Sequence, residues 1–378
     1  MSHHPFVIHV DEAVLIDLHQ RLEQTRWPDE IPQSGWDYGT NLSYLQRLVA
    51  YWRDGFDWRA QEQLLNAFPQ FQARIDGVGI HFVHMPGKGP RPLPLLISHG
   101  WPGSFFEMYK IIRPLADPAR YGGDPEDAFH VVVPSLPGFG FSDRPQQRGM
   151  DVARMAQLFL QLMTDELGYT QFGAQGGDWG SLICSQLGYA YPEKLIGIHL
   201  TMVPITSRPK ADEITPEIHH WQEQVQQFQS EGSGYSHIQG TCPQTLAYGL
   251  NDSPVGLAAW IVEKFRAWSD CNSDLESTFT REELLTTIMM YWVTQTINSS
   301  TRLYYEMRHA HHPPRGRVEV PTGVAAFPKD MVIPPRALAE KDFHIQHWST
   351  LDKGGHFAAL EQPETLVKEI HTFFRPLR

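Results

Sequence analysis

The segment Gly176-Gly177-Asp178-Trp179-Gly180 constrains the fold of this chain more than any other. It lies between a short strand-like run, Tyr169 to Ala174, and an apolar helical pattern, Leu182 to Tyr191. A sharp turn from a strand into a helix is crowded, so it needs small residues on both sides of its central residue. In such a turn the central residue is presented to substrate at the end of the strand. We interpret Asp178 as a nucleophile; the simpler alternative is a solvated Asp in a glycine-rich turn.

An aspartate in this position favours one kind of chemistry. A carboxylate that attacks carbon leaves an ester on the enzyme. That reaction suits an sp³ carbon that bears a leaving group, as in an epoxide or an alkyl halide. The ester must then be hydrolysed, so the sequence should also provide a base for water.

Apolar runs typical of buried strands alternate with helical patterns on both sides of this turn. Three such runs are Leu93 to Ser98, Phe129 to Pro134 and Leu195 to Met202. Strands that alternate with helices form right-handed units and a mostly parallel sheet flanked by helices. We therefore predict an α/β fold.

Two segments depart from this alternation. The N-terminal segment is polar, with helical patterns after Asp11 and from Leu42 to Trp52, and we expect it to form a meander over the main domain. The later segment predicts a helical cap over the sheet edge, from patterns at Ile218 to Gln229, Pro254 to Trp268 and Arg281 to Glu306. The predicted division is 1–75 meander, 76–203 first part of the core, 204–317 cap and 318–378 second part of the core.

Composition narrows the class of protein. The chain has 378 residues, of which 41% are hydrophobic, enough for a sizeable core. Its formal net charge of −12 argues against a nucleic-acid-binding surface. The three cysteines lack metal or disulfide spacing, which fits a reducing compartment. No apolar run reaches the roughly 18 residues of a membrane span, and Met1 to Asp11 lacks a signal-peptide pattern. We expect a soluble cytoplasmic protein without a membrane anchor.

A base and an acid follow Asp178 in the order that a nucleophile, acid and base take when each follows a strand of such a sheet. Asp330 comes after the strand-like run that ends the cap, and His356 comes after the last strand. His356 would take a proton from water, and Asp330 would orient the imidazole and stabilise its charged form. Asp330 could instead be a turn-forming residue, and Asp352 is a less favoured candidate for the acid because it precedes the turn at Gly354.

The run His99-Gly100-Trp101-Pro102 predicts an oxyanion hole. Backbone N–H groups must point at the oxygen that becomes negative when water attacks the ester. The N–H groups of Trp101 and Trp179 are the expected donors, since Pro102 has none to give. Next in the chain, Ser104 and Glu107 have the spacing of a capping box.

In combination these motifs resemble the epoxide hydrolases of the α/β-hydrolase superfamily, specifically the microsomal-type branch with an N-terminal meander. The similarity covers nearly the whole chain. The matching stretches are His99 to Ser104, Gly176 to Gly180, Phe327 to Asp330, Gly354 to Ala359, Gly234 to Gln239 and Leu250 to Ala258. The microsomal enzymes begin with a membrane anchor that Met1 to Asp11 does not contain, so membrane attachment is not carried over.

The resemblance also implies two cap tyrosines that hydrogen-bond the epoxide oxygen. They correspond to Tyr235 and Tyr304, and a phenol suits this role because it can protonate a basic alkoxide as it forms. Tyr305 adjoins Tyr304, but neighbours on a helix point about 100° apart, so one of them faces the site. We favour Tyr304; either tyrosine could also be an ordinary packing residue.

These observations predict an epoxide hydrolase that converts an apolar epoxide to a diol without a metal or an organic cofactor. The expected partner is a small molecule, and a homo-oligomer is compatible with the sequence. Two alternatives remain at this stage. A haloalkane dehalogenase shares the Asp nucleophile and would use Trp179 to bind halide, and a non-catalytic small-molecule receptor could share the fold.

Overall fold

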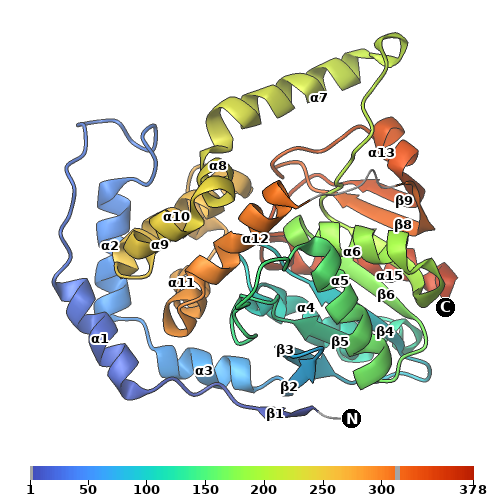
Figure 1. Ribbon diagram of the computed structural model, residues 1–378, viewed down its shortest axis with the longest axis horizontal. Coiled ribbons are helices and arrows are strands. Elements are labelled where there is room, and N and C mark those ends of the chain that lie inside the picture. Colours follow the sequence, from blue (N-terminus) through green and yellow to red (C-terminus); the bar gives the residue numbers. More distant parts are fainter. Residues whose placement is uncertain (1–2, 311–315) are drawn as a thin grey trace.

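The computed structural model describes residues 3–310 and 316–378, and a nine-stranded sheet forms the centre of this described part (Figure 1). The strand order is β1-β2-β3-β5-β4-β6-β7-β8-β9. The first pairings, up to β3 with β5, are antiparallel and the others are parallel. The strands are β1 (His4–Phe6), β2 (Gln70–Ile75), β3 (Val78–Met85), β4 (Leu93–Ser98), β5 (Phe129–Pro134), β6 (Phe172–Gly176), β7 (Leu195–Leu200), β8 (Val318–Ala326) and β9 (Phe343–Thr350).

Helices on both faces explain why the central strands are apolar along their whole length. Leu95, Leu96 and Ile97 of β4 are fully buried, as is the run Val131–Val133 of β5. Helix α6 packs on β4, β6, β7 and β8 and against α5, while α15 packs on β7 and β8 and against α4. These helices, with two shorter ones near the C-terminus, are α4 (Tyr109–Ala116), α5 (Val152–Gln161), α6 (Asp178–Ala190), α13 (Arg336–Asp342), α14 (Ala358–Glu361) and α15 (Pro363–Phe374). The predicted α/β fold with a mostly parallel sheet is confirmed.

A group of helices between β7 and β8 lies over the ends of the parallel strands (Figure 1). They are α7 (Pro216–Gln227), α8 (Gly234–Thr241), α9 (Pro243–Leu250), α10 (Pro254–Trp268), α11 (Arg281–Thr294) and α12 (Ile297–His309). The single helix expected from Arg281 to Glu306 is wrong. Gln295, with φ +52°, ends α11 in the left-handed conformation, and the chain then turns into α12. The predicted cap, 204–317, includes residues 311–315, which lie outside the described residues, and the domain boundaries stay a prediction.

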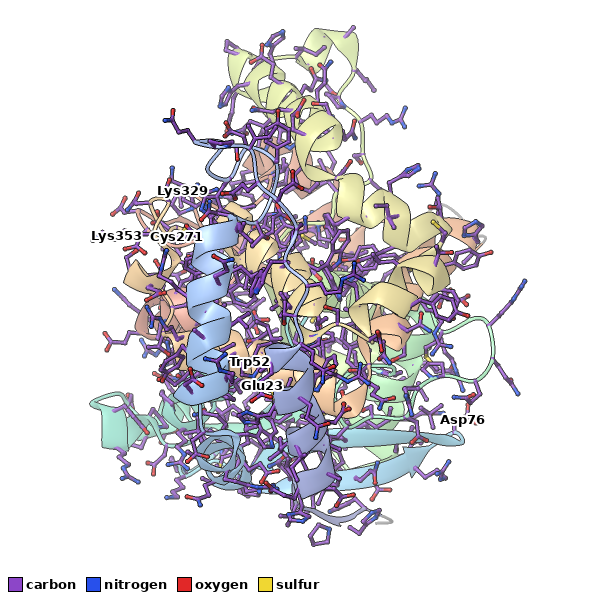
Figure 2. All side chains as sticks on the ribbon, turned by 90° about the vertical axis from the view of Figure 1, so that its left-hand side faces the viewer. Glu23, Trp52, Asp76, Cys271, Lys329 and Lys353 are labelled. Carbon is purple, nitrogen blue, oxygen red and sulfur yellow. The ribbon has the colours of Figure 1, made fainter. Side chains whose placement is uncertain are left out.

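The N-terminal segment contributes a strand to the central sheet and two helices that pack on the cap. β1 pairs with β2 and so extends the sheet, and α1 (Glu12–Glu23) and α2 (Leu42–Asp54) both pack on α10 of the cap. Figure 2 shows α1 and α2 in front of the cap helices, with Trp52 on α2. β1 and α3 (Trp58–Asn66) have no counterpart in the elements expected from the sequence. Among the described residues, no helix has the length and apolar character needed to cross a bilayer.

Candidate active site

Asp178 occupies a strained turn between β6 and α6. It is the first residue of α6 and has φ +47°, a left-handed conformation that is costly for a residue with a side chain. The flanking glycines are required by close backbone contacts. A Cβ on Gly180 would lie 2.0 Å from the carbonyl oxygen of Ser98, and one on Gly176 would lie 2.3 Å from the carbonyl carbon of Gly180. The turn thus has the geometry that the glycine pattern predicts.

Three parallel strands bring the predicted nucleophile, acid and base together at their carboxyl ends. His356 Nδ1 lies 2.7 Å from Asp330 Oδ1, and His356 Nε2 lies 3.6 Å from Asp178 Oδ2. The side chains of all three residues are largely buried. Asp352 is exposed, so the structure brings Asp330, and not Asp352, to the imidazole.

The two carboxylates determine the charge of the imidazole. Burial disfavours the imidazolium, but Asp330 and Asp178 outweigh this effect and hold the pKa of His356 well above its usual range. The imidazolium is therefore favoured while both carboxylates are charged. Removing the charge of either one would lower the pKa of His356.

The loop after β4 supplies a donor to the Asp178 carboxylate. The Trp101 N–H donates to Asp178 Oδ1 at 2.8 Å. The residue before it must be glycine, because a Cβ on Gly100 would lie 2.2 Å from that same oxygen. Trp179 follows Asp178 in the first turn of α6, where backbone N–H groups have no partner within the helix. The structure therefore places the Trp101 donor on the carboxylate, and the role of the Trp179 N–H stays a prediction.

The cap contributes two tyrosines opposite Asp178. The ring of Tyr235, from α8, stacks on Trp101 at a centroid distance of 5.4 Å, and the ring of Tyr304, from α12, packs edge-on against Trp179 at 4.7 Å. The two tyrosine rings are 5.8 Å apart. Tyr305 instead stacks on His309, so α12 presents Tyr304 to the site.

The hydroxyl of Tyr304 is buried without a satisfied hydrogen bond. It lies near Tyr235 and the indole of Trp179, but no described residue gives it a hydrogen bond of good geometry. Burial, followed by the charge of Asp178, raises the pKa of Tyr235, and burial likewise raises the pKa of Tyr304 well above the usual value. Both phenols are therefore protonated at neutral pH and can donate to a ligand oxygen.

Known proteins are similar to this chain over nearly its whole length. The family model described as "Epoxide hydrolase N terminus" matches residues 3–108, and that of the "alpha/beta hydrolase fold" matches residues 94–363. The chain is 39% identical to Epoxide hydrolase 1 of Oryctolagus cuniculus, over 98% of this chain and 88% of the rabbit protein.

The chain belongs to the epoxide hydrolase family.

Solved structures agree with this assignment. The juvenile hormone epoxide hydrolase of the silkworm Bombyx mori superimposes with a TM-score of 0.90 at 32% identity, over 100% of this chain and 95% of that one. The epoxide hydrolase of Aspergillus niger gives a TM-score of 0.88 at 27% identity, over 100% and 97% of the two chains. The family assignment favours an epoxide substrate over the dehalogenase and receptor alternatives.

In this epoxide hydrolase, hydrogen bonds that sequence reasoning missed join the cap to the loop that carries His356. The His356 N–H donates to the carbonyl of Trp268 at 2.8 Å, and the Gly354 N–H donates to Asp270 Oδ2 at 3.0 Å. In return, the Asp270 N–H donates to Glu361 Oε2 at 2.8 Å. Figure 2 labels Cys271, Lys329 and Lys353 where these segments meet. Residues 268–271 and 354–361 are distant in the chain, so no sequence signal could have paired them.

The predicted capping box at Ser104 is wrong. Ser104 Oγ accepts from the Phe106 N–H, and the first turn is a 3₁₀ helix, Phe105–Met108, rather than an α-helix. The Glu107 carboxyl lies against Gly103, where a Cβ would come within 2.1 Å of Oε2. Burial raises the pKa of Glu107 to about 8. The loop after β4 thus holds an additional carboxyl group, which the sequence pattern assigned to helix capping.

Proposed function

We propose that this epoxide hydrolase forms a covalent ester between Asp178 and the substrate. One observation carries the proposal: the Asp178 carboxylate lies between a backbone donor on Oδ1 and the imidazole of His356 beside Oδ2. Because the Trp101 N–H holds Oδ1, the oxygen available for attack is Oδ2. It forms the new bond to an epoxide carbon as the bond from that carbon to the epoxide oxygen breaks.

Tyr235 and Tyr304 assist the ring opening by donating to the epoxide oxygen. One phenol gives up its proton as the oxygen leaves, so the product of this step is a hydroxyalkyl ester and a tyrosinate. The unsatisfied Tyr304 hydroxyl gains a partner in the process. The aromatic walls formed by Trp101, Trp179 and Trp268 suit an epoxide with apolar substituents.

Ester formation prepares His356 for the second step. The ester removes the charge of Asp178, one of the two carboxylates that raise the pKa of His356, so the imidazolium gives its proton to the tyrosinate and the neutral imidazole becomes available as a base. It takes a proton from water, which attacks the ester carbonyl, and the Trp101 and Trp179 N–H groups hold the resulting oxyanion. The diol leaves with a proton from His356, and the proton released as the Asp178 carboxylate re-forms restores the His356 imidazolium.

A single turnover in ¹⁸O-labelled water tests the proposal. With enzyme in excess over styrene oxide, the first diol should carry unlabelled oxygen from Asp178, and the label should appear in a peptide that contains Asp178. Under multiple turnovers the diol should become labelled, which serves as the control. Label in the diol from the first turnover would mean that water attacks the epoxide directly.

We also propose a reducing, cytoplasmic location, which the three unpaired cysteines support.

A further inference from the structure

A buried lysine lies behind the aromatic wall of the site. Lys264 of α10 is 7% exposed, and its Nζ lies 4.7 Å from the ring centroid of Tyr235, 5.6 Å from that of Trp260 and 5.9 Å from that of Trp268. Its ion-pair partner is the adjacent Glu263, whose side chain is one-third exposed. The pair with Glu263 accounts for the buried charge, but it does not account for the placement of the ammonium against three rings.

The ring nearest to the ammonium belongs to the proposed proton donor. Tyr235 stacks on Trp101, whose N–H holds the Asp178 carboxylate, and the ring of Trp268 packs edge-on against His356 at 5.3 Å. Lys264 itself makes no described contact with Asp178 or His356. Any influence on the reaction would therefore pass through the aromatic rings, and first through Tyr235.

The charges around Tyr235 oppose its role as an acid. Burial and the carboxylates of Asp178 and Glu263 disfavour negative charge on its oxygen, and the neighbouring Tyr304 phenol only partly offsets them. Among the described residues, Lys264 is the cation that lies over the Tyr235 ring. A cation over an aromatic face is attracted more strongly as the ring system becomes negative, and burial strengthens this attraction.

We propose that Lys264 is a positioning residue for ring opening, which stabilises the negative charge on Tyr235 as this tyrosine gives its proton to the epoxide oxygen. The proposal rests on the proposed ester mechanism. Its chemistry adds no reactant: the proton passes from Tyr235 Oη to the epoxide oxygen, and Lys264 takes no part in the proton transfer. Hydrolysis of the ester does not need Tyr235 as an acid, so Lys264 should affect the first step only.

The test is a pair of substitutions, Lys264→Met, which keeps the length of the side chain without its charge, and Lys264→Arg, which keeps the charge. Rates of ester formation and of ester hydrolysis are measured separately by single-turnover quenching and intact-protein mass. We expect Lys264→Met to slow ester formation about tenfold to thirtyfold, with unchanged hydrolysis, and Lys264→Arg to recover most of the rate.

A second comparison separates charge stabilisation from packing. In a Tyr235→Phe background, Lys264→Met should cause little further loss, whereas in a Tyr304→Phe background it should cause its full loss. Equal losses in both backgrounds, or a parallel slowing of hydrolysis, would overturn the proposal. If Lys264→Met does not fold, Glu263→Gln tests the same idea: removal of this opposing charge should leave ester formation as fast or faster, and a slower step would contradict it.

A His356→Gln background distinguishes the role of Lys264 from the ester mechanism itself. In a His356→Gln background, a covalent adduct on Asp178 reports the mechanism whatever the residue at position 264. An adduct that forms at the same rate with Lys264 and with Lys264→Met would contradict the role of Lys264 alone. The lack of any adduct in the presence of Lys264 would contradict the mechanism, and with it the inference.

Discussion

The core side and the cap side of the site are held in different ways. On the core side, the Trp101 N–H and the Asp330–His356 pair provide hydrogen bonds of 2.8 and 2.7 Å, and Asp178 sits on a strained backbone. On the cap side, Tyr235 and Tyr304 are held by ring packing, and the Tyr304 hydroxyl lacks a partner. Charged groups must be oriented in advance to stabilise a transition state, whereas an unsatisfied donor gains its hydrogen bond from the substrate.

The largest expected effect comes from the core. Asp178→Asn should reduce turnover by about 10⁴-fold or more, because no other group in this geometry can form the ester. Steady-state diol formation measures the rate, and the mass of the intact protein should show no adduct. Asn can deamidate to Asp, so Asp178→Ala is the control. Normal turnover by the alanine variant would rule out Asp178 as the nucleophile.

Replacement of His356 should separate the two reaction steps, ester formation and ester hydrolysis. His356→Gln should leave ester formation largely intact and slow hydrolysis by about 10³-fold, since only water activation needs the base. Intact protein should then gain the mass of one substrate molecule, mapped by peptide analysis to Asp178. A variant in which both steps slow equally would show that His356 also orients the nucleophile.

Substitutions on the cap side should have the opposite step dependence. Tyr235→Phe and Tyr304→Phe should each slow ester formation about 10-fold to 100-fold without changing hydrolysis of an ester already formed. Tyr304→Phe should also stabilise the protein by about 1 kcal/mol or more, because it removes a buried hydroxyl that lacks a partner. Thermal unfolding measures this change. Tyr305→Phe is the matched control and should leave both rates unchanged.

The link between the two sides gives a smaller effect. Asp270→Asn removes a charged acceptor from the Gly354 N–H and should loosen the loop that carries His356. We expect hydrolysis to slow by about threefold to tenfold, with ester formation unchanged. Glu361→Gln, which weakens the bond from the Asp270 N–H, should behave alike. A slowdown confined to ester formation would mean that these contacts position the cap rather than the base.

The smallest effect concerns stability and pH. Burial raises the pKa of Glu107 to about 8 from an ordinary value of 4.5, so between these values the folded protein holds a proton that the unfolded chain releases. Its contribution to stability is present below pH 4.5 and is lost as pH rises through 8. Glu107→Gln should therefore flatten the fall of the melting temperature over this range. Glu231→Gln, at an exposed position, should leave the curve unchanged.

Much of this protein can be predicted from the sequence alone where the physical cause is local. Gly176 reflects a contact within the turn itself, although Gly180 also meets Ser98 of β4. Alternating strands and helices predict a parallel sheet whose strand ends bring Asp178, Asp330 and His356 together. The motifs were also sufficient to indicate the epoxide hydrolase family. The chemical roles of these residues stay predictions, which the rate measurements above would test.

Only the tertiary structure decided the features that depend on contacts between distant segments. The packing of α12 on α8 and α9 turns Tyr304 toward Trp179 and leaves Tyr305 on His309, although both residues lie on the same apolar pattern. Glu107 likewise lies near distant groups, because the charges of His356 and Asp178 act on its carboxyl. The position of Lys264 behind Tyr235 belongs to the same class, because the segments concerned come together only when the cap folds over the sheet.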